Sequence, residues 1–176
     1  MKTNIALIGF MGTGKTAVGK VLAQKLHREF IELDARIEKK AGKPIPEIFR
    51  QDGETRFREL EIEAVRDVAI KKNAVIACGG GIVLNTINID RLKKECVIIY
   101  LTAAPSVILK RTASDKGGRP LLNVADRAQE IKKLLDFRRP FYTRTADITV
   151  NTSRLNINRV VDKILETLKN YESHHR

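Results

Sequence analysis

The stretch GFMGTGKT, residues 9–16, has the residue types and the spacing that bind the phosphates of a nucleotide. The pattern G-x-x-x-x-G-K-[ST] of the phosphate-binding P-loop is matched at Gly9, Gly14, Lys15 and Thr16. Glycines allow backbone N–H groups to curl around phosphate oxygens, and the positive end of a following helix adds to the attraction. We expect Lys15 to reach the β- and γ-phosphates and Thr16 to offer its hydroxyl to Mg²⁺. The motif therefore predicts a binding site for a nucleoside triphosphate.

Two carboxylates at the end of a strand-like run have a spacing that suits a metal and an acceptor hydroxyl. In FIELD, residues 30–34, Glu32 and Asp34 are two positions apart on an extended segment, so their side chains point the same way. One acid suits the water shell of the metal, and the other suits a substrate hydroxyl. The chain has no N-K-x-D motif for guanine, and the apolar runs VIAC and VIIYL lack the terminal acid that ATPase motors use. Among P-loop proteins, the small-molecule kinases fit this pattern best.

Three consecutive glycines follow a strand-like run in the stretch VIACGGGIV, residues 75–83. Glycine costs conformational entropy and offers no side chain to pack, so the triplet needs a reason. A tight turn is the alternative, but it seldom needs more than one or two glycines. Ligands bind at the carboxyl ends of parallel strands. We therefore expect Gly79, Gly80 and Gly81 to line a site at which a Cβ would fill room that a ligand needs.

Short apolar runs alternate with longer helical patterns along the whole chain. The expected strands are residues 4–10, 30–34, 74–78, 96–102 and 147–152. The expected helices are residues 15–26, 52–72, 104–112, 123–139 and 154–171. Strands that alternate with helices predict a single α/β domain whose parallel sheet is covered on both faces.

The composition is that of a globular protein with a strongly basic balance. The 176 residues carry a net charge of +12, and 43% are hydrophobic, 5% are aromatic and none is tryptophan. A basic chain favours an anionic partner, but the interleaving of basic and aromatic residues that binds single-stranded nucleic acid is missing.

No apolar run approaches the roughly 20 residues of a membrane span, and the first residues do not form a signal peptide. Cys78 and Cys96 have no metal-ligand spacing. We expect reduced thiols and a cytoplasmic protein without a membrane or nucleic-acid partner.

The sequence also resembles the shikimate kinases in several separated stretches that follow the order of the family. These stretches are GFMGTGKT, FIELDARIEKKAGKPIPEIF, DGETRFRELE, ACGGGIV, GGRPLL and RRPFY. The resemblance implies a single P-loop kinase domain over residues 1–176. Its sheet would have five parallel strands in the order 2-3-1-4-5, as in nucleoside monophosphate kinases. The resemblance also implies substrate-binding helices at about 33–61 and a mobile lid at about 112–124 that carries Arg119.

The implied reaction is the ATP-dependent phosphorylation of shikimate at its 3-hydroxyl, in chorismate biosynthesis, by a monomer that uses Mg²⁺. The implied catalytic residues are Lys15, Asp34 and Arg119. The implied ATP-binding residues are Gly12, Thr13, Gly14, Lys15, Thr16, Ala17, Arg111, Arg119 and Arg154. The implied shikimate-binding residues are Asp34, Arg58, Gly79, Gly80, Gly81 and Arg138, among which the two arginines clamp the carboxylate. The implied metal-binding residues are Thr16 and Glu32, the latter directly or through water.

Two positions depart from the family pattern, and two other functions remain as alternatives. Glu32 stands where the family has the first aspartate of D-x-D, and Ile157 stands where a proline is common.

Among small-molecule kinases, the alternative is a kinase for another polyol acid such as gluconate. Arg58, Glu61 and Arg138 argue against it, because Glu61 is three residues from Arg58 on an expected helix and can orient its guanidinium. The alternative from a different class is a catalytically silent, nucleotide-dependent module that binds nucleic acid through its positive charge.

Overall fold

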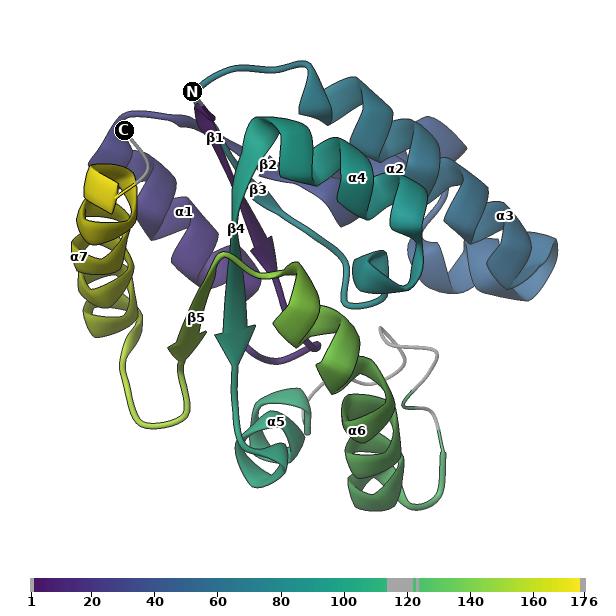
Figure 1. Cartoon of the computed structure of the whole chain (residues 1–176). Coiled ribbons are helices and arrows are strands. Elements are labelled where there is room, and N and C mark those ends of the chain that lie inside the picture. The colour runs from purple at the N-terminus through teal and green to yellow at the C-terminus, as the bar shows by residue number, and fades with distance from the viewer. Residues whose placement is uncertain (1, 114–121, 123, 175–176) are drawn as a thin grey trace.

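Five parallel strands form one sheet in the structure, a computed structural model that describes residues 2–113, 122 and 124–174 (Figure 1). The strands are β1 (Asn4–Ile8), β2 (Glu29–Glu32), β3 (Ala74–Ala77), β4 (Cys96–Thr102) and β5 (Ile148–Asn151). Their order, β2-β3-β1-β4-β5, confirms the predicted order. Most of the predicted lid, including Arg119, lies outside the described residues, so the lid stays a prediction.

Helices cover both faces of this sheet, as the sequence predicted. The helices are α1 (Lys15–Leu26), α2 (Leu33–Ala41), α3 (Ile45–Ala69), α4 (Thr86–Glu95), α5 (Pro105–Thr112), α6 (Arg127–Thr145) and α7 (Ile157–His174), with a 3-10 turn at Ile82–Leu84. Figure 1 shows α1 and α7 on one side of the sheet and α2, α3 and α4 on the other. None of the described helices is both long enough and apolar enough to cross a membrane.

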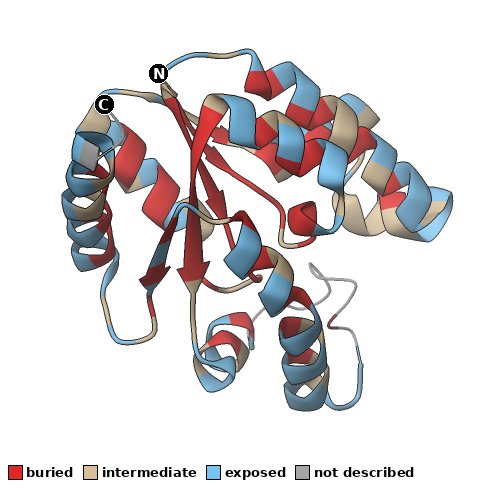
Figure 2. Cartoon of the chain, in the orientation of Figure 1, coloured by how far each residue is buried: buried red, intermediate tan, exposed pale blue. Residues whose placement is uncertain are grey.

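The sheet separates two hydrophobic clusters because alternate residues of its central strands point to opposite faces. On β1, Ile5 and Leu7 pack toward α1 and α7, whereas Ala6 and Ile8 pack toward the helices of the other face. β1 is therefore buried on both faces, as the apolar run in its sequence predicted. Figure 2 shows the buried residues concentrated in the sheet and on the helix faces turned toward it.

The structure differs at several places from the elements that the apolar pattern predicted. β2 ends at Glu32 and α2 begins at Leu33, so Glu32 and Asp34 do not share one extended segment as expected. α6 continues through Pro140 to Thr145, beyond the expected end at residue 139.

The sequence predicted no helix at 86–95, where α4 lies with its N-terminus capped by the Asn85 side chain, which accepts from the N–H of Ile87. The expected helix start at Asp52 or Gly53 agrees with the structure, because α3 joins two helical segments across Gly53, whose backbone is not helical. The apolar pattern missed the first of these segments, which begins at Ile45. Gly53 has a φ of 82°, a left-handed conformation that glycine adopts without strain.

Candidate active site

A cavity of about 380 Å³ opens at the carboxyl ends of β1, β2 and β3, where ligands bind in parallel sheets. Its lining unites the P-loop with the two acids of FIELD and the start of the glycine triplet. The lining residues are Met11, Gly12, Gly14, Lys15, Thr16, Ala17, Glu32, Asp34, Ala77, Cys78, Gly79, Gly80 and Arg111. The structure therefore brings together most of the residues that the sequence predicted for nucleotide, metal and acceptor.

The P-loop between β1 and α1 depends on Gly9 and Gly14, which the motif specifies, and on Gly12, which it does not. Gly12 and Gly14 have φ values of 78° and 96°, which side chains rarely adopt, and a Cβ on Gly9 would collide with the carbonyl oxygen of Leu101. Lys15 Nζ donates to the carbonyl oxygens of Gly9 over 2.8 Å and Phe10 over 3.0 Å. Because α1 begins at Lys15, the positive end of the helix faces the cavity. This arrangement can bind phosphate.

Arg111 on α5 links the P-loop to the segment after β5. Its Nη1 atom donates to the carbonyl oxygen of Gly12 over 3.2 Å and to Thr152 Oγ1 over 3.0 Å, and its Nη2 atom donates to the Thr152 carbonyl oxygen over 2.9 Å. Thr152 Oγ1 also lies 3.1 Å from the carbonyl oxygen of Thr13. Arg111 lines the cavity, whereas Arg154 is exposed in the turn after β5 and is absent from the lining. The ATP contacts expected for both arginines stay predictions.

Thr16 and Glu32 form the candidate metal site. Thr16 Oγ1 donates to Glu32 Oε1 over 2.6 Å, so a hydroxyl and a carboxylate from two different elements already lie together. The described residues contain no cluster of three side chains that could hold a metal by themselves. Mg²⁺ commonly takes one or two protein oxygens and completes its shell with water and phosphate oxygens. The donor set at Thr16 and Glu32 fits such an ion.

Asp34, in the first turn of α2, is a buried acid with one oxygen that can still accept a hydrogen bond. Burial raises the pKa of its carboxyl above the usual value, and the positive charge of Lys15 partly opposes this rise. Its Oδ1 atom is buried and has no hydrogen-bond partner among the residues that the structure describes. The carboxylate borders the cavity, so it can accept a hydrogen bond from an alcohol of a bound substrate.

The glycine triplet after β3 provides room for charged side chains of the protein itself. A Cβ on Gly79 would lie 3.1 Å from Asp34 Oδ1 and 3.3 Å from Glu61 Oε1. A Cβ on Gly81 would lie only 2.6 Å from both terminal nitrogens of Arg58. None of the three glycines has a positive φ, so the requirement is for space and not for an unusual backbone. The sequence had assigned this space to a ligand alone and had missed the protein's own side chains.

Arg58 and Arg138 reach the triplet from two different helices. Arg58 on α3 donates through Nη1 to Glu61 over 3.2 Å, which is the pairing that the sequence predicted, and through Nη2 to Glu54 over 3.1 Å. Arg138 on α6 is only 4% exposed, and its Nη1 atom lies 3.6 Å from the position of a Cβ on Gly80. Its buried Nε atom has no hydrogen-bond partner among the described residues. Two guanidinium groups beside one triplet can bind a carboxylate.

Two further residues hold this arrangement, Glu61, which the sequence predicted as the partner of Arg58, and Tyr142, which was not singled out. The Tyr142 hydroxyl on α6 donates to the carbonyl oxygen of Gly80. Glu61 is fully buried, and burial raises the pKa of its carboxyl to about 7 although Arg58 and Arg138 oppose the rise. Tyr142 ends the stretch RRPFY, which was the only signal for it, and its hydrogen bond joins two parts of the chain that the sequence cannot place together.

Comparison with known proteins places this chain in one family. The family model described as shikimate kinase matches residues 11–169, which is most of the chain. The chain belongs to the shikimate kinase family. A shikimate kinase of Pelotomaculum thermopropionicum is 48% identical over 168 residues, covering 96% of each chain. A shikimate kinase of Caldanaerobacter subterraneus subsp. tengcongensis is 49% identical over 162 residues, covering 92% of this chain and 94% of that one.

A solved structure of this family has the same fold. Shikimate kinase from Acinetobacter baumannii, in complex with shikimate, superposes with a TM-score of 0.93 at 38% identity, covering 97% of this chain and 94% of that one. The resemblance that the sequence motifs indicated is thereby confirmed, as are the single-domain α/β kinase fold and membership of the kinases.

Proposed function

We propose that the chain transfers the γ-phosphate of ATP to the 3-hydroxyl of shikimate and releases shikimate 3-phosphate and ADP, a step of aromatic amino-acid biosynthesis. The observation that carries the proposal is the pair Arg58 and Arg138 beside the glycine triplet, next to the P-loop cavity. A carboxylate bound by two guanidinium groups distinguishes an acid from a neutral polyol. The family members named above and the shikimate complex of the relative from Acinetobacter baumannii support shikimate as this acid.

Each residue of the site then has a role that its position permits. Asp34 accepts the hydrogen bond of the reacting hydroxyl and takes its proton, because Asp34 lines the cavity and its Oδ1 atom has no hydrogen-bond partner among the described residues. Lys15 places positive charge where negative charge develops during transfer. Thr16 and Glu32 would hold Mg²⁺, which when bound neutralises the charge of the β- and γ-phosphates. Arg119, by resemblance alone, would contact the transferring phosphate.

An acceptor-dependent assay tests the proposed function. ADP release is measured with shikimate, with gluconate and without an acceptor, and phosphorus NMR locates the phosphate on the product. We expect ADP release that depends on shikimate and a phosphate on the 3-oxygen. Turnover of gluconate without turnover of shikimate would select the other polyol acid. Absence of turnover together with steeply salt-dependent binding of DNA or RNA would select the silent module.

Replacement of Glu32 tests the proposed metal site. Glu32→Asp restores the shorter acid that is usual in the family, so we expect it to keep activity, with a Mg²⁺ requirement equal to or below that of the wild type. Glu32→Ala removes the carboxylate that Thr16 contacts, so we expect it to raise the Mg²⁺ concentration for half-maximal activity several-fold. The measurement is a Mg²⁺ titration at saturating ATP and shikimate. Identical titrations for the wild type and both variants would remove Glu32 from the metal site.

Replacement of Gly81 tests whether this position needs glycine to leave room for the Arg58 guanidinium. The methyl group in Gly81→Ala would lie 2.6 Å from the Arg58 guanidinium, so that flexible group must move aside. We expect the KM for shikimate to rise about ten- to a hundredfold, with an unchanged thermal unfolding temperature. Gly80→Ala is the matched comparison, because its Cβ meets protein atoms only at 3.5 Å or more, and any loss of activity there reports the ligand. An unaltered KM in Gly81→Ala would contradict this explanation.

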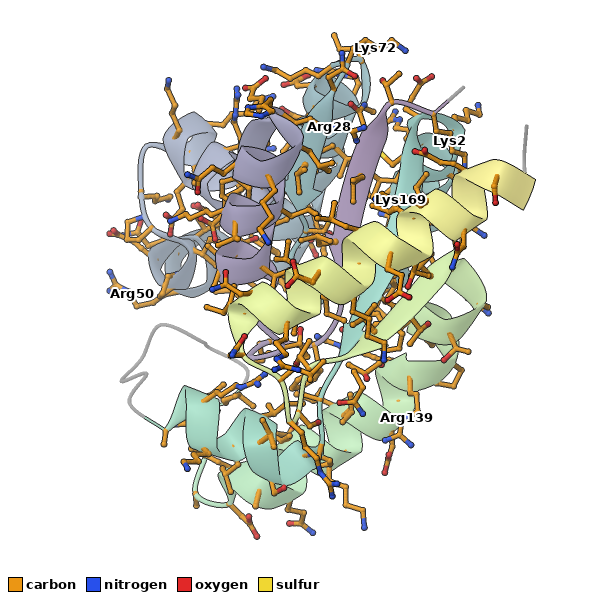
Figure 3. All side chains as sticks on the ribbon, turned by 90° about the vertical axis from the view of Figure 1, so that its left-hand side faces the viewer. Lys2, Arg28, Arg50, Lys72, Arg139 and Lys169 are labelled. Carbon is orange, nitrogen blue, oxygen red and sulfur yellow. The ribbon has the colours of Figure 1, made fainter. Side chains whose placement is uncertain are left out.

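The proposal includes a cytoplasmic monomer that does not bind nucleic acid in spite of its charge of +12. Several surface lysines are neutralised by acids of neighbouring elements, such as Lys71 by Glu29 over 2.7 Å and Lys72 by Glu95 over 2.9 Å. Figure 3 shows the labelled cations spread from Lys72 near the top of the molecule to Arg139 in its lower half. Among the described residues, cations that are spread and paired in this way differ from the continuous basic stripe that tracks a nucleic-acid backbone.

A further inference from the structure

Asn88 is a buried amide on α4 that contacts Glu61, the partner of Arg58 in the candidate site. It is 0% exposed, and its Nδ2 atom donates to Oε2 of Glu61 over 3.4 Å. Its Oδ1 atom is buried and has no hydrogen-bond partner among the described residues. A buried carbonyl oxygen without a donor destabilises the fold, which an apolar side chain would avoid. The hydrogen bond to Glu61 is therefore what distinguishes this amide from an apolar side chain of similar volume.

Glu61 has few donors for a carboxylate that is fully buried. Arg58 Nη1 contacts its two oxygens over 3.2 and 3.3 Å, and Asn88 is the other donor that the structure gives it. The Arg58 guanidinium in turn lies against Gly81, where a Cβ would be 2.6 Å away. The order of contacts is thus Asn88 to Glu61, Glu61 to Arg58, and Arg58 to the glycine triplet.

A second hydrogen bond holds α3 and α4 together beside the contact between Asn88 and Glu61. The helices α3 and α4 lie side by side, and Arg91 Nη1 on α4 donates to the carbonyl oxygen of Ile62 on α3 over 3.1 Å. Asn88 lies one turn before Arg91, and Ile62 follows Glu61 directly. The amide is therefore held opposite the carboxylate by an independent hydrogen bond between the same two helices.

We propose that Asn88 is a positioning residue for the substrate carboxylate, because it keeps Glu61 ionised and in place and Glu61 keeps the Arg58 guanidinium against Gly81. The proposal rests on the proposed function, since it takes Arg58 to bind the carboxylate of shikimate. When Arg58 shares its charge with that carboxylate, Asn88 remains a neutral donor to Glu61. Glu61 and the shikimate carboxylate then do not have to share Arg58 as their one hydrogen-bond donor, because Asn88 also donates to Glu61.

The groups that face Glu61 determine how the contact depends on pH. Asp34 on α2 raises the pKa of Glu61, whereas Arg58 on α3 and Arg138 on α6 lower it, and burial is the largest influence, raising the value to about 7. The nearby Cys78 thiol stays neutral because burial raises its own pKa. A donor to a carboxylate favours the ionised form and lowers its pKa. Removal of Asn88 therefore raises the pKa of Glu61 further.

The sign of the expected effect follows from the form of Glu61 that the clamp needs. Ionised Glu61 orients Arg58, so shikimate binds well above the pKa of Glu61 and less well as the pH falls through it. Loss of a hydrogen bond to a charged group corresponds to about one pH unit. In Asn88→Leu and Asn88→Ala, the rise in the KM for shikimate should begin about one pH unit higher than in the wild type. At pH 7 the KM should be about three- to tenfold above that of the wild type, and near pH 9 the values should converge.

The experiment measures kcat and KM for shikimate and for ATP from about pH 6 to about pH 9 in the wild type and both variants. Asn85→Ala is the matched control, because it removes the cap of the same helix without touching Glu61. We expect this control to unfold at a lower temperature and to keep the pH profile of the wild type. The KM for ATP should stay constant in all variants.

Three results would overturn the assignment. One is a KM profile for shikimate that does not move in the Asn88 variants, and another is a loss of kcat that is the same at every pH. The third is loss of the folded state in both variants, which would assign Asn88 to folding alone. Failure of the wild type to phosphorylate shikimate would instead overturn the proposed function, so the two failures are distinguishable.

Discussion

Lys15→Ala is expected to reduce phosphoryl transfer about a thousandfold or more while the chain stays folded. Lys15 lies in the P-loop with its Nζ atom on the carbonyl oxygens of Gly9 and Phe10, beside the end of α1 that faces the cavity. Its charge is needed most when charge shifts between the β- and γ-phosphates, and removal of one fixed group of this kind costs about a hundred- to a thousandfold in kcat. Loss of a full positive charge places the expectation at the upper end.

A second lysine on the same helix provides the control. Lys20→Ala removes the same charge from an exposed position of α1 and should leave kcat unchanged. Circular dichroism and thermal unfolding establish that both variants are folded, and single-turnover measurements with saturating ATP report transfer itself. Near-normal transfer in Lys15→Ala would show that the P-loop lysine has another role.

Truncation of either clamp arginine is expected to weaken shikimate binding roughly thirtyfold to a few thousandfold. A guanidinium binds a carboxylate through two parallel hydrogen bonds in one plane, and loss of one partner of a buried charge pair costs about 2–5 kcal/mol. Each 1.4 kcal/mol is about tenfold in affinity. Arg58→Ala also leaves Glu61 buried without its main partner, so part of the loss there arises from the protein. Arg58→Lys keeps the charge without the planar fork and should recover only a part.

Arg139→Ala is the matched control for Arg138→Ala. The two arginines are neighbours on α6, but the Arg139 side chain is 55% exposed and pairs with Asp136 on the same helix over 3.2 Å. Its removal should leave shikimate binding unchanged. A shikimate analogue with a neutral amide in place of the carboxylate completes the test. The wild type should discriminate strongly against the amide and the alanine variants much less, and equal turnover of both by the wild type would exclude the clamp.

The choice between Arg138 and Arg139 shows what the sequence could and could not decide. RRPFY contains both, and only the resemblance to the family favoured Arg138, because the residue types do not separate the two neighbours. In the structure, the buried residues of α6 are Ile131, Leu135, Arg138, Tyr142 and Thr145, at spacings of four, three, four and three. The helical period therefore contained the answer once the buried face was known. The strands were predictable for a similar reason, since central strands that are buried on both faces are continuous apolar runs.

The rest of the site depends on contacts between segments that are distant in the sequence. Asn88 lies in a short helix whose polar pattern predicted no structure, and its partner Glu61 is 27 residues away. The sequence predicted that a ligand needs the room at the triplet, and it did not predict the protein side chains that lie there. No local rule says that the side chains of Asp34 and Arg58 would lie against Gly79 and Gly81. Such contacts follow from how α2 and α3 pack over the sheet.

The bond between Thr152 and the P-loop has a consequence for synthesis of the protein on the ribosome. The P-loop is among the first segments to emerge, but Thr152, which contacts the carbonyl oxygen of Thr13 and anchors Arg111, lies 139 residues beyond Thr13. At ordinary rates of translation this delay is on the order of 10 s. Until then the nascent loop lacks the hydrogen bond of Thr13 with Thr152, and Arg111 lacks its anchor. The nucleotide site, encoded first, is completed nearly last.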